Sequence, residues 1–442
     1  MKNKKKGISV LGLGKLGACY AAFYASKGYP IIGLDINQNN IDLLNKGISP
    51  VKEPGLQELI NNHKAFIRAT SDHGRLLSDS DLTFIILPTP SKPNGLFSVD
   101  YVVQAAKDIG PHLRNKKGYH VFTLVSTVLP EDSRKYIIPA FEKNSGKKCG
   151  VDFGYVYSPS LIAIGDILKN LQEPDFLFLG AHDERSREMV ASVYNDIYNN
   201  EKSVEHMTIE SAELAKISLN AYVTMKITFA NILGHICTNL EQADVDDITN
   251  ALGKDQRVGR KYLRSGLGYG GTCFPRDNYA FAAMSKKFGV SSPMALLTHK
   301  LNDQVWQRNL STILKSAGKD KRIGVLGISY RPKITLSDKS QALFITQGLI
   351  KKRCKVMLFE PLGHEHEAIR ILGKKVDYAT TLPKIFKKCD VIFISNNDQM
   401  FTEIPKIVEK ISAKKTIIDP WGMFTKKHFN KNIEYISPGR KK

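Results

Sequence analysis

Long apolar runs and paired cysteine motifs are what this sequence of 442 residues lacks. No stretch approaches the roughly 20 uncharged apolar residues that a membrane span requires. The start, MKNKKKGISVLGLG, passes from lysines into a predicted strand without a cleavage site. The six cysteines are scattered, with no C-x-x-C pair and no Cys/His cluster at zinc spacing. We therefore expect a cytoplasmic protein with no membrane partner and no bound metal.

Acidic residues are also in short supply, because 64 Lys and Arg face 43 Asp and Glu, for a net charge of +21. Such an excess calls for an anionic partner to be considered. The positive charge is spread along the chain, and no motif for base stacking or groove reading accompanies it. We expect no nucleic-acid partner. A lysine-rich genome and the steering of a phosphate-bearing small molecule both explain the charge.

Short apolar runs alternate with helix-like segments through the first 160 residues. The runs are GISVLGLG, YPIIGLD, DLTFIILPTP, HVFTLVST and FGYVYSP, a pattern that predicts a doubly wound parallel sheet. One long helical stretch replaces the alternation around residues 205–245, and the alternation resumes from Arg322 with RIGVLGISY, CKVMLFEP, CDVIFISN and KTIIDPWG. We predict an α/β protein with two Rossmann-like doubly wound domains joined by a long central helix.

Gly12, Gly14 and Gly17 form a G-x-G-x-x-G pattern directly after the strand-like ISVL, and Asp35 follows 18 residues after Gly17. The glycines allow a tight turn and a close approach to a pyrophosphate, and the acidic side chain holds a ribose 2′-hydroxyl. Because Asp35 would repel a 2′-phosphate, the pattern predicts NAD rather than NADP. The alternative is a glycine-rich turn beside a surface aspartate.

A polar stripe runs along the otherwise apolar helix predicted over residues 205–245. At about 100° per residue, five polar side chains fall on one side of this helix. They are Glu213, Lys216, Asn220, Thr224 and Asn231. One interpretation is that these side chains bond one another between packed helices. The interpretation we favour is a stripe that faces a ligand, with Lys216 and Asn220 placed to bind an oxyanion and a water.

The glycine-rich segment GLGYGGTCFPRD covers residues 266–277 and ends in Cys273, Arg276 and Asp277. Most cysteines are small buried hydrophobic residues. A cysteine at the end of a loop rich in backbone amides, with a cation nearby, can instead act as a nucleophile. We predict this role for Cys273 and a structural role for the other cysteines.

With these motifs the sequence closely resembles the UDP-glucose/GDP-mannose dehydrogenase family of nucleotide-sugar dehydrogenases, along essentially the whole chain. The resemblance rests on GLGKLG with Asp35, EPGLQEL, PTP at 88–90, STV at 126–128, ELAKISLNAYVTMK, DQRVGRKYLRSGLGYGGTCFPRD and GVLGISYRPK. It implies an NAD-binding Rossmann domain over 1–200, a central helical dimerisation region over 201–310 and a nucleotide-sugar-binding Rossmann-like domain over 311–442. It therefore also implies a homodimer through the central helix.

The family's reaction oxidises a sugar C6 alcohol to a carboxylate with two NAD, through an aldehyde captured on a cysteine. By this resemblance Cys273 is the nucleophile that forms the thiohemiacetal and then the thioester. Lys216 corresponds to a lysine that stabilises oxyanions, and Asn220 to its hydrogen-bonding neighbour. Asp277 corresponds to a carboxylate that positions water or tunes the lysine, and Thr127 to a threonine near the nicotinamide.

The resemblance implies two sets of binding residues as well. The cofactor set is Gly12, Gly14, Lys15, Leu16, Gly17, Asp35, Thr89, Pro90, Ser126, Thr127 and Arg276. The substrate set is Ser160, Leu161, Lys216, Asn220, Arg257, Tyr262, Leu263, Gly270, Phe274, Tyr330 and Arg331. Arg257 resembles an arginine that reaches the sugar from the partner subunit, and Arg331 takes the place of a lysine at the nucleotide site.

The chain departs from the family pattern at three positions. Where the family reads N-P-E-F-L, residues 158–162 read SPSLI, so Ser160 replaces a glutamate expected to assist thioester hydrolysis. Serine is no general base at neutral pH, and such a base contributes about 10² to 10⁴ in rate. Asp338 and Trp421 stand where the family motifs R-E-S-P and D-G-R have arginine. Both bear on the substrate more than on the fold.

Three hypotheses for function follow. The first is an NAD-dependent nucleotide-sugar 6-dehydrogenase, with a UDP-sugar as the expected substrate. The second is a reaction that halts at the aldehyde or thioester because of Ser160, unless Asp277, Glu173 or Glu213 substitutes for the glutamate. The third is a non-catalytic, dimeric NAD-binding protein. NADH formed per sugar consumed separates the three.

Overall fold

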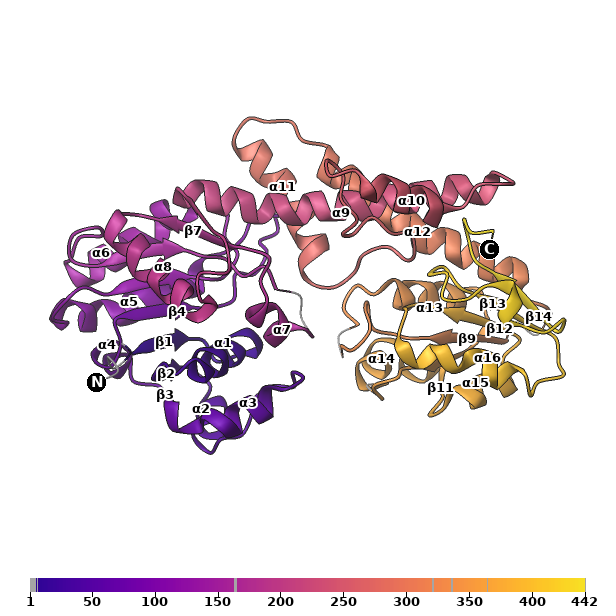
Figure 1. Ribbon diagram of the computed structural model, residues 1–442, viewed down its shortest axis with the longest axis horizontal. Helices are drawn as coiled ribbons and strands as arrows, with labels where there is room; N and C mark the ends of the chain where they lie inside the picture. The colour runs from indigo at the N-terminus through magenta and orange to yellow at the C-terminus, as the bar shows by residue number, and fades with distance from the viewer. Residues whose placement is uncertain are drawn as a thin grey trace. The chain divides into compact units, whose positions relative to one another are not determined.

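We describe the protein from a computed structural model, which places residues 5, 7–162, 165–319, 322–334, 337–363 and 365–441. The chain divides into two compact units, Met1–Ser218 and Leu219–Lys442. Each unit has its own β-sheet with helices packed on it, and Figure 1 shows the first in indigo to magenta and the second in rose through orange to yellow. The units meet in sequence within the helix α9 (Ile209–Asn239).

The first unit is built from short strands and from helices that connect them. Its strands are β1 (Ile8–Leu11), β2 (Ile31–Leu34), β3 (Ile67–Thr70), β4 (Leu82–Ile85), β5 (Val121–Leu124), β6 (Gly154–Tyr157), β7 (Leu177–Ala181) and β8 (Val204–Met207). Its helices before α9 are α1 (Lys15–Ser26), α2 (Gln38–Asn45), α3 (Leu56–His63), α4 (His73–Ser78), α5 (Asp100–Asn115), α6 (Ile138–Ser145), α7 (Ile167–Gln172) and α8 (Glu184–Tyr198), with the short turns η1 (Lys64–Phe66) and η2 (Ser133–Ile137).

The eight strands form one sheet in the order β3-β2-β1-β4-β5-β6-β7-β8. Strands from β3 to β6 are parallel, as predicted, and the strand order reverses between β1 and β4. The five predicted strands pair in parallel as expected, and the sheet adds β7, which no predicted run covers, antiparallel to β6. In its described residues, the connection from β6 to β7 holds the six-residue α7 and no crossover helix that would return the chain for a parallel pairing.

Both faces of this sheet are covered, which explains its continuous apolar strands. Ile8 and Val10 of β1 belong to a core with α1, α3 and α8, while Leu11 belongs to a second core with α4, α5 and α6. Alternate strand residues therefore pack against opposite helical layers. The loops at the carboxyl edge of the parallel strands are left to form a site.

The second unit starts within α9 and continues through helices into a second sheet. Its helices after α9 are α10 (Val245–Lys254), α11 (Cys273–Lys287), α12 (Met294–Ser316), α13 (Gln341–Lys351), α14 (Glu365–Leu372), α15 (Leu382–Lys388) and α16 (Ile404–Val408), with the turns η3 (Gly373–Lys375), η4 (Gln399–Glu403) and η5 (Lys426–His428). Its strands are β9 (Arg322–Leu326), β10 (Lys355–Phe359), β11 (Asp377–Tyr378), β12 (Val391–Ile394), β13 (Lys415–Ile418) and β14 (Ile433–Ile436).

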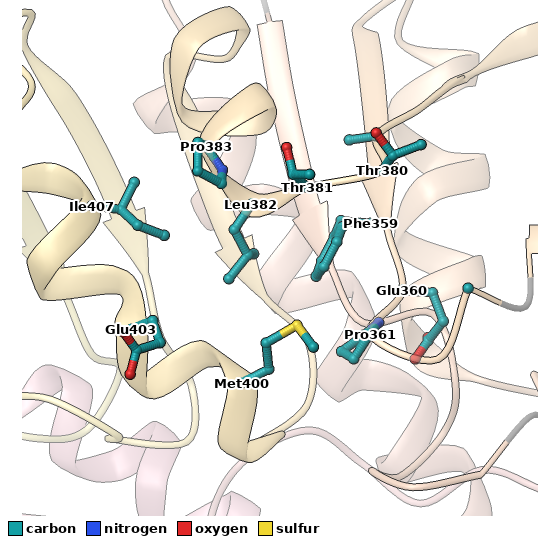
Figure 2. A pocket seen from close by; sticks show the side chains of 12 residues that line it. Phe359, Glu360, Pro361, Thr380, Thr381, Leu382, Pro383, Met400, Glu403 and Ile407 are labelled. Atoms are coloured by element: carbon teal, nitrogen blue, oxygen red, sulfur yellow. The ribbon is translucent and has the colours of Figure 1, made fainter.

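This second sheet is entirely parallel, in the order β11-β10-β9-β12-β13-β14, and it reverses between β9 and β12. Helices α12 and α13 pack on one face, and α15 and α16 on the other. A cavity of about 560 Å³ lies beside the carboxyl ends of β10 and β11 (Figure 2). The predicted α/β class, with two Rossmann-like sheets and a long helix between them in the chain, is confirmed.

The described helices include none that is both long and apolar enough to cross a membrane.

Candidate active site

The loop between β1 and α1 carries the glycine pattern, and each glycine has its own steric role. Gly12 has a φ of +94°, and a Cβ there would lie 2.4 Å from the carbonyl oxygen of Ile86. A Cβ on Gly17 would lie 1.7 Å from the carbonyl oxygen of Gly12, so α1 packs at a distance that only glycine allows. A Cβ on Gly14 would meet nothing within 4 Å. The loop is therefore closed toward the protein and open at Gly14.

Asp35 follows β2, and its carboxylate binds the glycine loop. Oδ2 accepts a hydrogen bond from the Leu13 amide at 2.6 Å, and Oδ1 accepts one from the Asn37 amide at 2.8 Å. The carboxylate is thus fixed at the carboxyl edge, beside the start of α1. Lys15 and Leu16 are the first residues of α1, whose N-terminus favours an anionic group.

Two further loops meet at the point where the strand order reverses. The loop after β4 carries Thr89 and Pro90, and the loop after β5 carries Ser126 and Thr127. The Thr89 hydroxyl donates to the Thr127 carbonyl oxygen at 2.7 Å, and the Ser126 hydroxyl donates to the Leu87 carbonyl oxygen at 2.6 Å. Doubly wound sheets bind ligands in this crevice, so the predicted cofactor residues of the first unit share one edge.

These residues fit a dinucleotide without a 2′-phosphate. The open face at Gly14 leaves room for a pyrophosphate against the helix N-terminus, and the Asp35 carboxylate lies where the adenosine ribose of a dinucleotide binds. The fold and this loop define the first unit as the dinucleotide-binding domain of an oxidoreductase.

Lys216 is buried in the first part of α9, with 7% of its surface exposed. Its Nζ donates a hydrogen bond to the carbonyl oxygen of Ser160 at 2.7 Å. The Ser160 hydroxyl lies beside the Tyr20 phenol, whose pKa is raised by burial. Leu161, the next predicted substrate residue, is half-buried. Ser160 thus offers the lysine a main-chain oxygen and no carboxylate.

Glu213 lies one turn before Lys216 and is completely buried. Its carboxylate accepts hydrogen bonds from the Glu131 amide at 2.9 Å and the Ser133 amide at 3.1 Å. Burial raises the pKa of Glu213 to about 7. Because both oxygens are held by the main chain of the segment after Thr127, Glu213 braces α9 against a cofactor loop.

Cys273 is the first residue of α11 and is exposed. Its Sγ lies 3.7 Å from the Thr272 hydroxyl, at a helix N-terminus that favours negative charge. Asp277 follows one turn later and is 1% exposed. The Asp277 carboxylate accepts hydrogen bonds from Asn220 Nδ2 at 2.6 Å and from Arg276 Nε at 3.3 Å. The predicted nucleophile and three of its predicted companions therefore lie together in the second unit.

Some side chains of the polar stripe on α9 bond other parts of the protein, and others bond predicted site residues. Thr224 bonds Asn278 of α11, and the Asn231 carboxamide oxygen accepts a hydrogen bond from the Gly266 amide at 2.9 Å. Like Glu213, these two side chains are buried and bond other parts of the protein. The packing interpretation holds for these three, whereas Lys216 and Asn220 bond a carbonyl and a carboxylate of predicted site residues.

Side chains that sequence reasoning missed hold the cysteine loop. The Asn302 carboxamide accepts from the Tyr269 amide at 2.8 Å and donates to the Tyr269 carbonyl at 3.1 Å. Gln341 accepts from the Gly268 amide at 2.9 Å and donates to the Asn302 carbonyl at 2.9 Å. Both are buried and come from α12 and α13, far along the chain. No local signal marks them, because polar side chains occur throughout α12 and Gln341 is the first residue of α13.

The predicted substrate residues of the second unit lie on both sides of this loop. A Cβ on Gly270 would lie 2.6 Å from the Lys339 carbonyl oxygen, and one on Gly271 would lie 2.8 Å from Cζ of Tyr330. The Tyr330 ring therefore packs flat on the loop, and burial raises the pKa of its phenol. Arg331 follows Tyr330 directly and is half-buried.

The remaining predicted residues precede the cysteine. Tyr262 has a φ of +65° and packs edge-on against Phe274, with ring centroids 6.4 Å apart, whereas Leu263 is buried. Arg257 has 89% of its side chain exposed and pairs with Asp255 at 2.6 Å. Arg257 is therefore largely in solvent, bonded to a neighbouring carboxylate.

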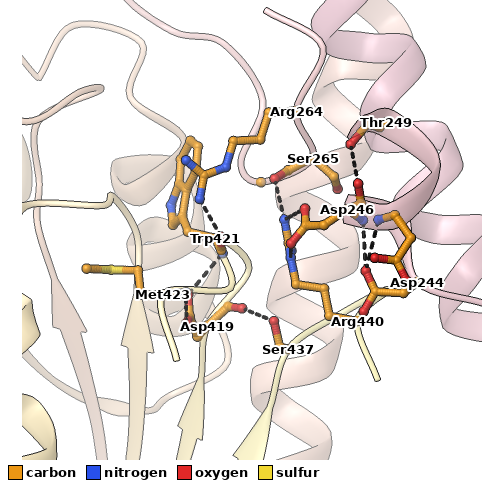
Figure 3. Close-up of polar contacts among 12 residues, drawn as sticks. Asp244, Asp246, Thr249, Arg264, Ser265, Asp419, Trp421, Met423, Ser437 and Arg440 are labelled. Atoms are coloured by element: carbon orange, nitrogen blue, oxygen red, sulfur yellow. Dashed lines mark hydrogen bonds and ion pairs between the residues drawn. The ribbon is translucent and has the colours of Figure 1, made fainter. Parts of the chain in front are cut away.

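The C-terminal segment fastens the start of the same loop (Figure 3). Arg440 Nε donates to Asp246 at 2.7 Å, and Arg440 Nη2 donates to the Ser265 carbonyl at 2.9 Å. Arg264 Nη2 donates to the carbonyl of Trp421 at 2.9 Å. A Cβ on Gly266 would lie 2.5 Å from the Trp421 ring. The tryptophan at the expected arginine position is thus a packing residue of the loop.

Comparison with known proteins gives the same assignment along the chain. Residues 6–198 match the NAD binding domain of the UDP-glucose/GDP-mannose dehydrogenase family, residues 210–304 its central domain and residues 324–426 its UDP binding domain. The chain belongs to this family, and it is an NAD-dependent nucleotide-sugar dehydrogenase.

Relatives include enzymes for two nucleotide sugars. The chain is 30% identical to UDP-glucose 6-dehydrogenase AglM of Haloferax volcanii, over 90% of this chain and 92% of that protein. It is 28% identical to GDP-mannose 6-dehydrogenase of Pseudomonas aeruginosa, over 93% of this chain and 95% of that protein. A UDP-glucose dehydrogenase structure from Pyrobaculum islandicum has a TM-score of 0.86 and 26% identity, covering 100% of this chain and 99% of that one.

Proposed function

We propose that this chain oxidises the C6 alcohol of a UDP-sugar to the uronate, through intermediates bound to Cys273. The observation that carries the proposal is the placement of Cys273, exposed at the N-terminus of α11, with the Asn220–Asp277 pair one turn away. A thiolate there would meet no steric barrier, and the loop amides before it can bind an oxyanion.

The reaction balances as two oxidations and one hydrolysis, and NAD, when bound, supplies the hydride acceptor for both oxidations. Loss of a hydride from C6 and of a proton from its hydroxyl gives the aldehyde. Cys273 Sγ adds to the aldehyde to form a thiohemiacetal, and loss of a second hydride from C6 with the hydroxyl proton leaves a thioester. Addition of water releases the carboxylate and restores the thiol.

Lys216 and Thr127 complete the proposed catalytic set. The Lys216 ammonium, which now bonds the Ser160 carbonyl, is the cation of this set and would stabilise the oxyanion at C6. Thr127 belongs to the loop that Thr89 fastens at the cofactor edge, and there it would contact the nicotinamide. The binding residues inferred from the family resemblance are part of the same proposal.

The choice of a UDP-sugar rests on two findings. The family model that matches residues 324–426 is described as a UDP binding domain. A UDP-glucose dehydrogenase has a TM-score of 0.86 over the whole chain. Relatives that act on GDP-mannose make this nucleotide the alternative to test.

Hydrolysis without the family's glutamate is the step that needs a substitute base. Glu213 is held by two main-chain amides, and Glu173 is exposed at the end of α7. Asp277 lies four residues after Cys273 on one helix, so both side chains share a face. We assign to Asp277 the removal of the proton from the attacking water.

The experiment is NADH yield per sugar, with excess NAD, on UDP-glucose, UDP-N-acetylglucosamine, UDP-galactose and GDP-mannose, together with product mass. Two NADH and an acid support the proposal. One NADH and an aldehyde mean that the reaction halts before the second oxidation, while NAD binding with no reduction on any sugar supports a non-catalytic protein. The Cys273→Ser variant should form no carboxylate, and full acid production by it would contradict the thioester route.

We also propose that the chain forms a homodimer through α9. Tyr222, Phe229 and Ile236 are spaced by seven residues and are 49%, 48% and 48% exposed. They lie on the face of α9 opposite the buried Thr224 and Asn231, as a seam for a second copy requires. Sedimentation should find a dimer that Phe229→Asp dissociates.

A control for the dimer proposal is Tyr101→Asp, which changes another exposed aromatic residue and should leave the dimer intact. If both variants sediment like the unmodified protein, α9 is not the interface. The division into regions 1–200, 201–310 and 311–442, and the cytoplasmic location, remain proposals from the sequence.

A further inference from the structure

The second sheet repeats the loop geometry of the first. After β9, the Gly327 amide donates to the Phe359 carbonyl at 2.8 Å, and Gly327 has a φ of +86°. The Ile328 amide donates to Glu360 Oε2 at 2.6 Å, and the Ser329 amide donates to the same oxygen at 3.0 Å. Glu360 follows β10 as Asp35 follows β2. The acidic residue that marks the nucleoside end of a doubly wound sheet is therefore present twice in this chain.

The phosphate end of such a site is absent from the second sheet. The loop reads Gly327-Ile328-Ser329-Tyr330, without the second and third glycines of the first loop. Within the described residues the next helix, α13, begins only at Gln341. No helix N-terminus follows the turn to hold a pyrophosphate.

A cavity of about 560 Å³ lies at the nucleoside end, within the range of about 300–1,000 Å³ typical of small-molecule sites. Its apolar lining includes Phe359, Pro361, Leu382, Met400 and Ile407. In Figure 2, Leu382 and Met400 extend into the space from opposite sides. Apolar side chains on two sides suit a flat aromatic base.

Polar groups lie around the same space. Glu360, Thr380, Thr381 and Glu403 line it, and Glu360 is buried whereas the other three are exposed. Hydroxyls and carboxylates bind ribose hydroxyls, and the two carboxylates disfavour a phosphate within the cavity. The cavity keeps the recognition chemistry for a nucleoside and rejects the charge of its phosphates.

We propose that this cavity binds a purine ribonucleoside, in addition to the NAD of the first unit and the nucleotide sugar. The base packs between Leu382 and Met400, and the ribose meets Glu360 and Thr381. A purine is favoured over a pyrimidine because it fills more of the volume. A free nucleoside and the nucleoside part of a mononucleotide share this chemistry, and the probes below distinguish them.

The test titrates the full-length protein, saturated with NADH so that the first site is occupied, with adenosine, AMP and uridine in turn. Methyl NMR of methionine-labelled protein follows binding at Met400, whose signal is assigned by its loss in Met400→Leu. We expect adenosine to shift the Met400 signal saturably. Uridine should bind about 10-fold more weakly than adenosine, and AMP should also bind more weakly than adenosine, because its phosphate meets the carboxylates of Glu360 and Glu403.

Two matched variants locate the site. Thr380→Trp fills the cavity from an exposed position and should weaken adenosine binding about 10-fold or more. Ser412→Trp places the same side chain on an exposed residue just before β13, at the opposite edge of the sheet, and should change nothing. No shift at Met400, equal loss in both variants, or tighter binding of uridine than of adenosine would overturn the proposal. None of these readouts depends on turnover, so they stay separate from the test of the dehydrogenase activity.

Discussion

Replacement of Glu213 by glutamine tests two opposing effects on the pKa of one buried carboxyl group. Burial disfavours the ionised form, and the amides of Glu131 and Ser133 favour it. Burial dominates, since the pKa of Glu213 is raised from 4.5 to about 7. That difference corresponds to about 3 kcal/mol between the protonation states.

The sign of the pH dependence follows from proton binding. The folded protein holds the Glu213 proton more tightly than the unfolded chain, so this group lowers stability as pH rises from about 4.5 to about 7 and adds no further change above that. Glutamine is neutral at every pH and matches the protonated acid in shape. The free energy of unfolding of Glu213→Gln, minus that of the unmodified protein, should therefore increase by about 3 kcal/mol as the pH rises from 5 to 8.

The assay is urea unfolding of both proteins at several pH values across this window, and the quantity compared is the difference in free energy of unfolding at each pH. A difference that stays level would show that Glu213 titrates alike in both states. A difference that moves the opposite way would show that the two amide hydrogen bonds outweigh burial, and the reasoning above would be refuted.

Three further outcomes follow from the geometry. Gly14→Ala should fold normally, because its Cβ meets nothing within 4 Å, and it should weaken NAD binding in a fluorescence titration. Gly17→Ala should instead lower the melting temperature, because its Cβ would lie 1.7 Å from the Gly12 carbonyl oxygen. Asn302→Ala removes both main-chain bonds of Tyr269, so kcat should fall more than tenfold with NAD affinity unchanged. Trp421→Arg should lower the melting temperature by scanning calorimetry, because a charged chain replaces a ring packed on Gly266.

The parts of the fold that sequence predicted best are those fixed by local chemistry. The runs around Ile8–Leu11 and Arg322–Leu326 are mostly apolar and are each followed by glycine, as is common for buried parallel strands. The strands β3, β7, β8, β11 and β14 escaped prediction. No continuous apolar run marks β3, β8 or β14, which alternate or are largely exposed, and β11 has only two residues, whereas the apolar run of β7 was overlooked.

The candidate site was predictable where its residues lie in one motif. Gly12 to Asp35 and Cys273 to Asp277 fall within short stretches whose spacing has a physical reason. The groups that hold the cysteine loop, among them Asn302, Gln341 and Arg440, come from separate elements. Nothing in local sequence specifies such partners, because tertiary packing alone brings a distant side chain to a main-chain amide or carbonyl.

The three departures from the family pattern have a common structural consequence. At each position the main-chain oxygen accepts a hydrogen bond from another site residue. The Ser160 carbonyl binds Lys216 Nζ at 2.7 Å, and the Asp338 carbonyl accepts from the Gly271 amide at 2.9 Å. The Trp421 carbonyl accepts from Arg264 at 2.9 Å.

Any amino acid supplies that oxygen, so the side chain at each position can change without releasing the lysine or the glycine-rich loop. The geometry of the site is therefore separable from the chemistry of positions 160, 338 and 421. Under the proposed reaction, the missing carboxylate at 160 would affect thioester hydrolysis, and the missing positive charge at 338 and 421 would affect binding of the nucleotide sugar. Substrate preference in this chain therefore has to be measured across both nucleotide classes.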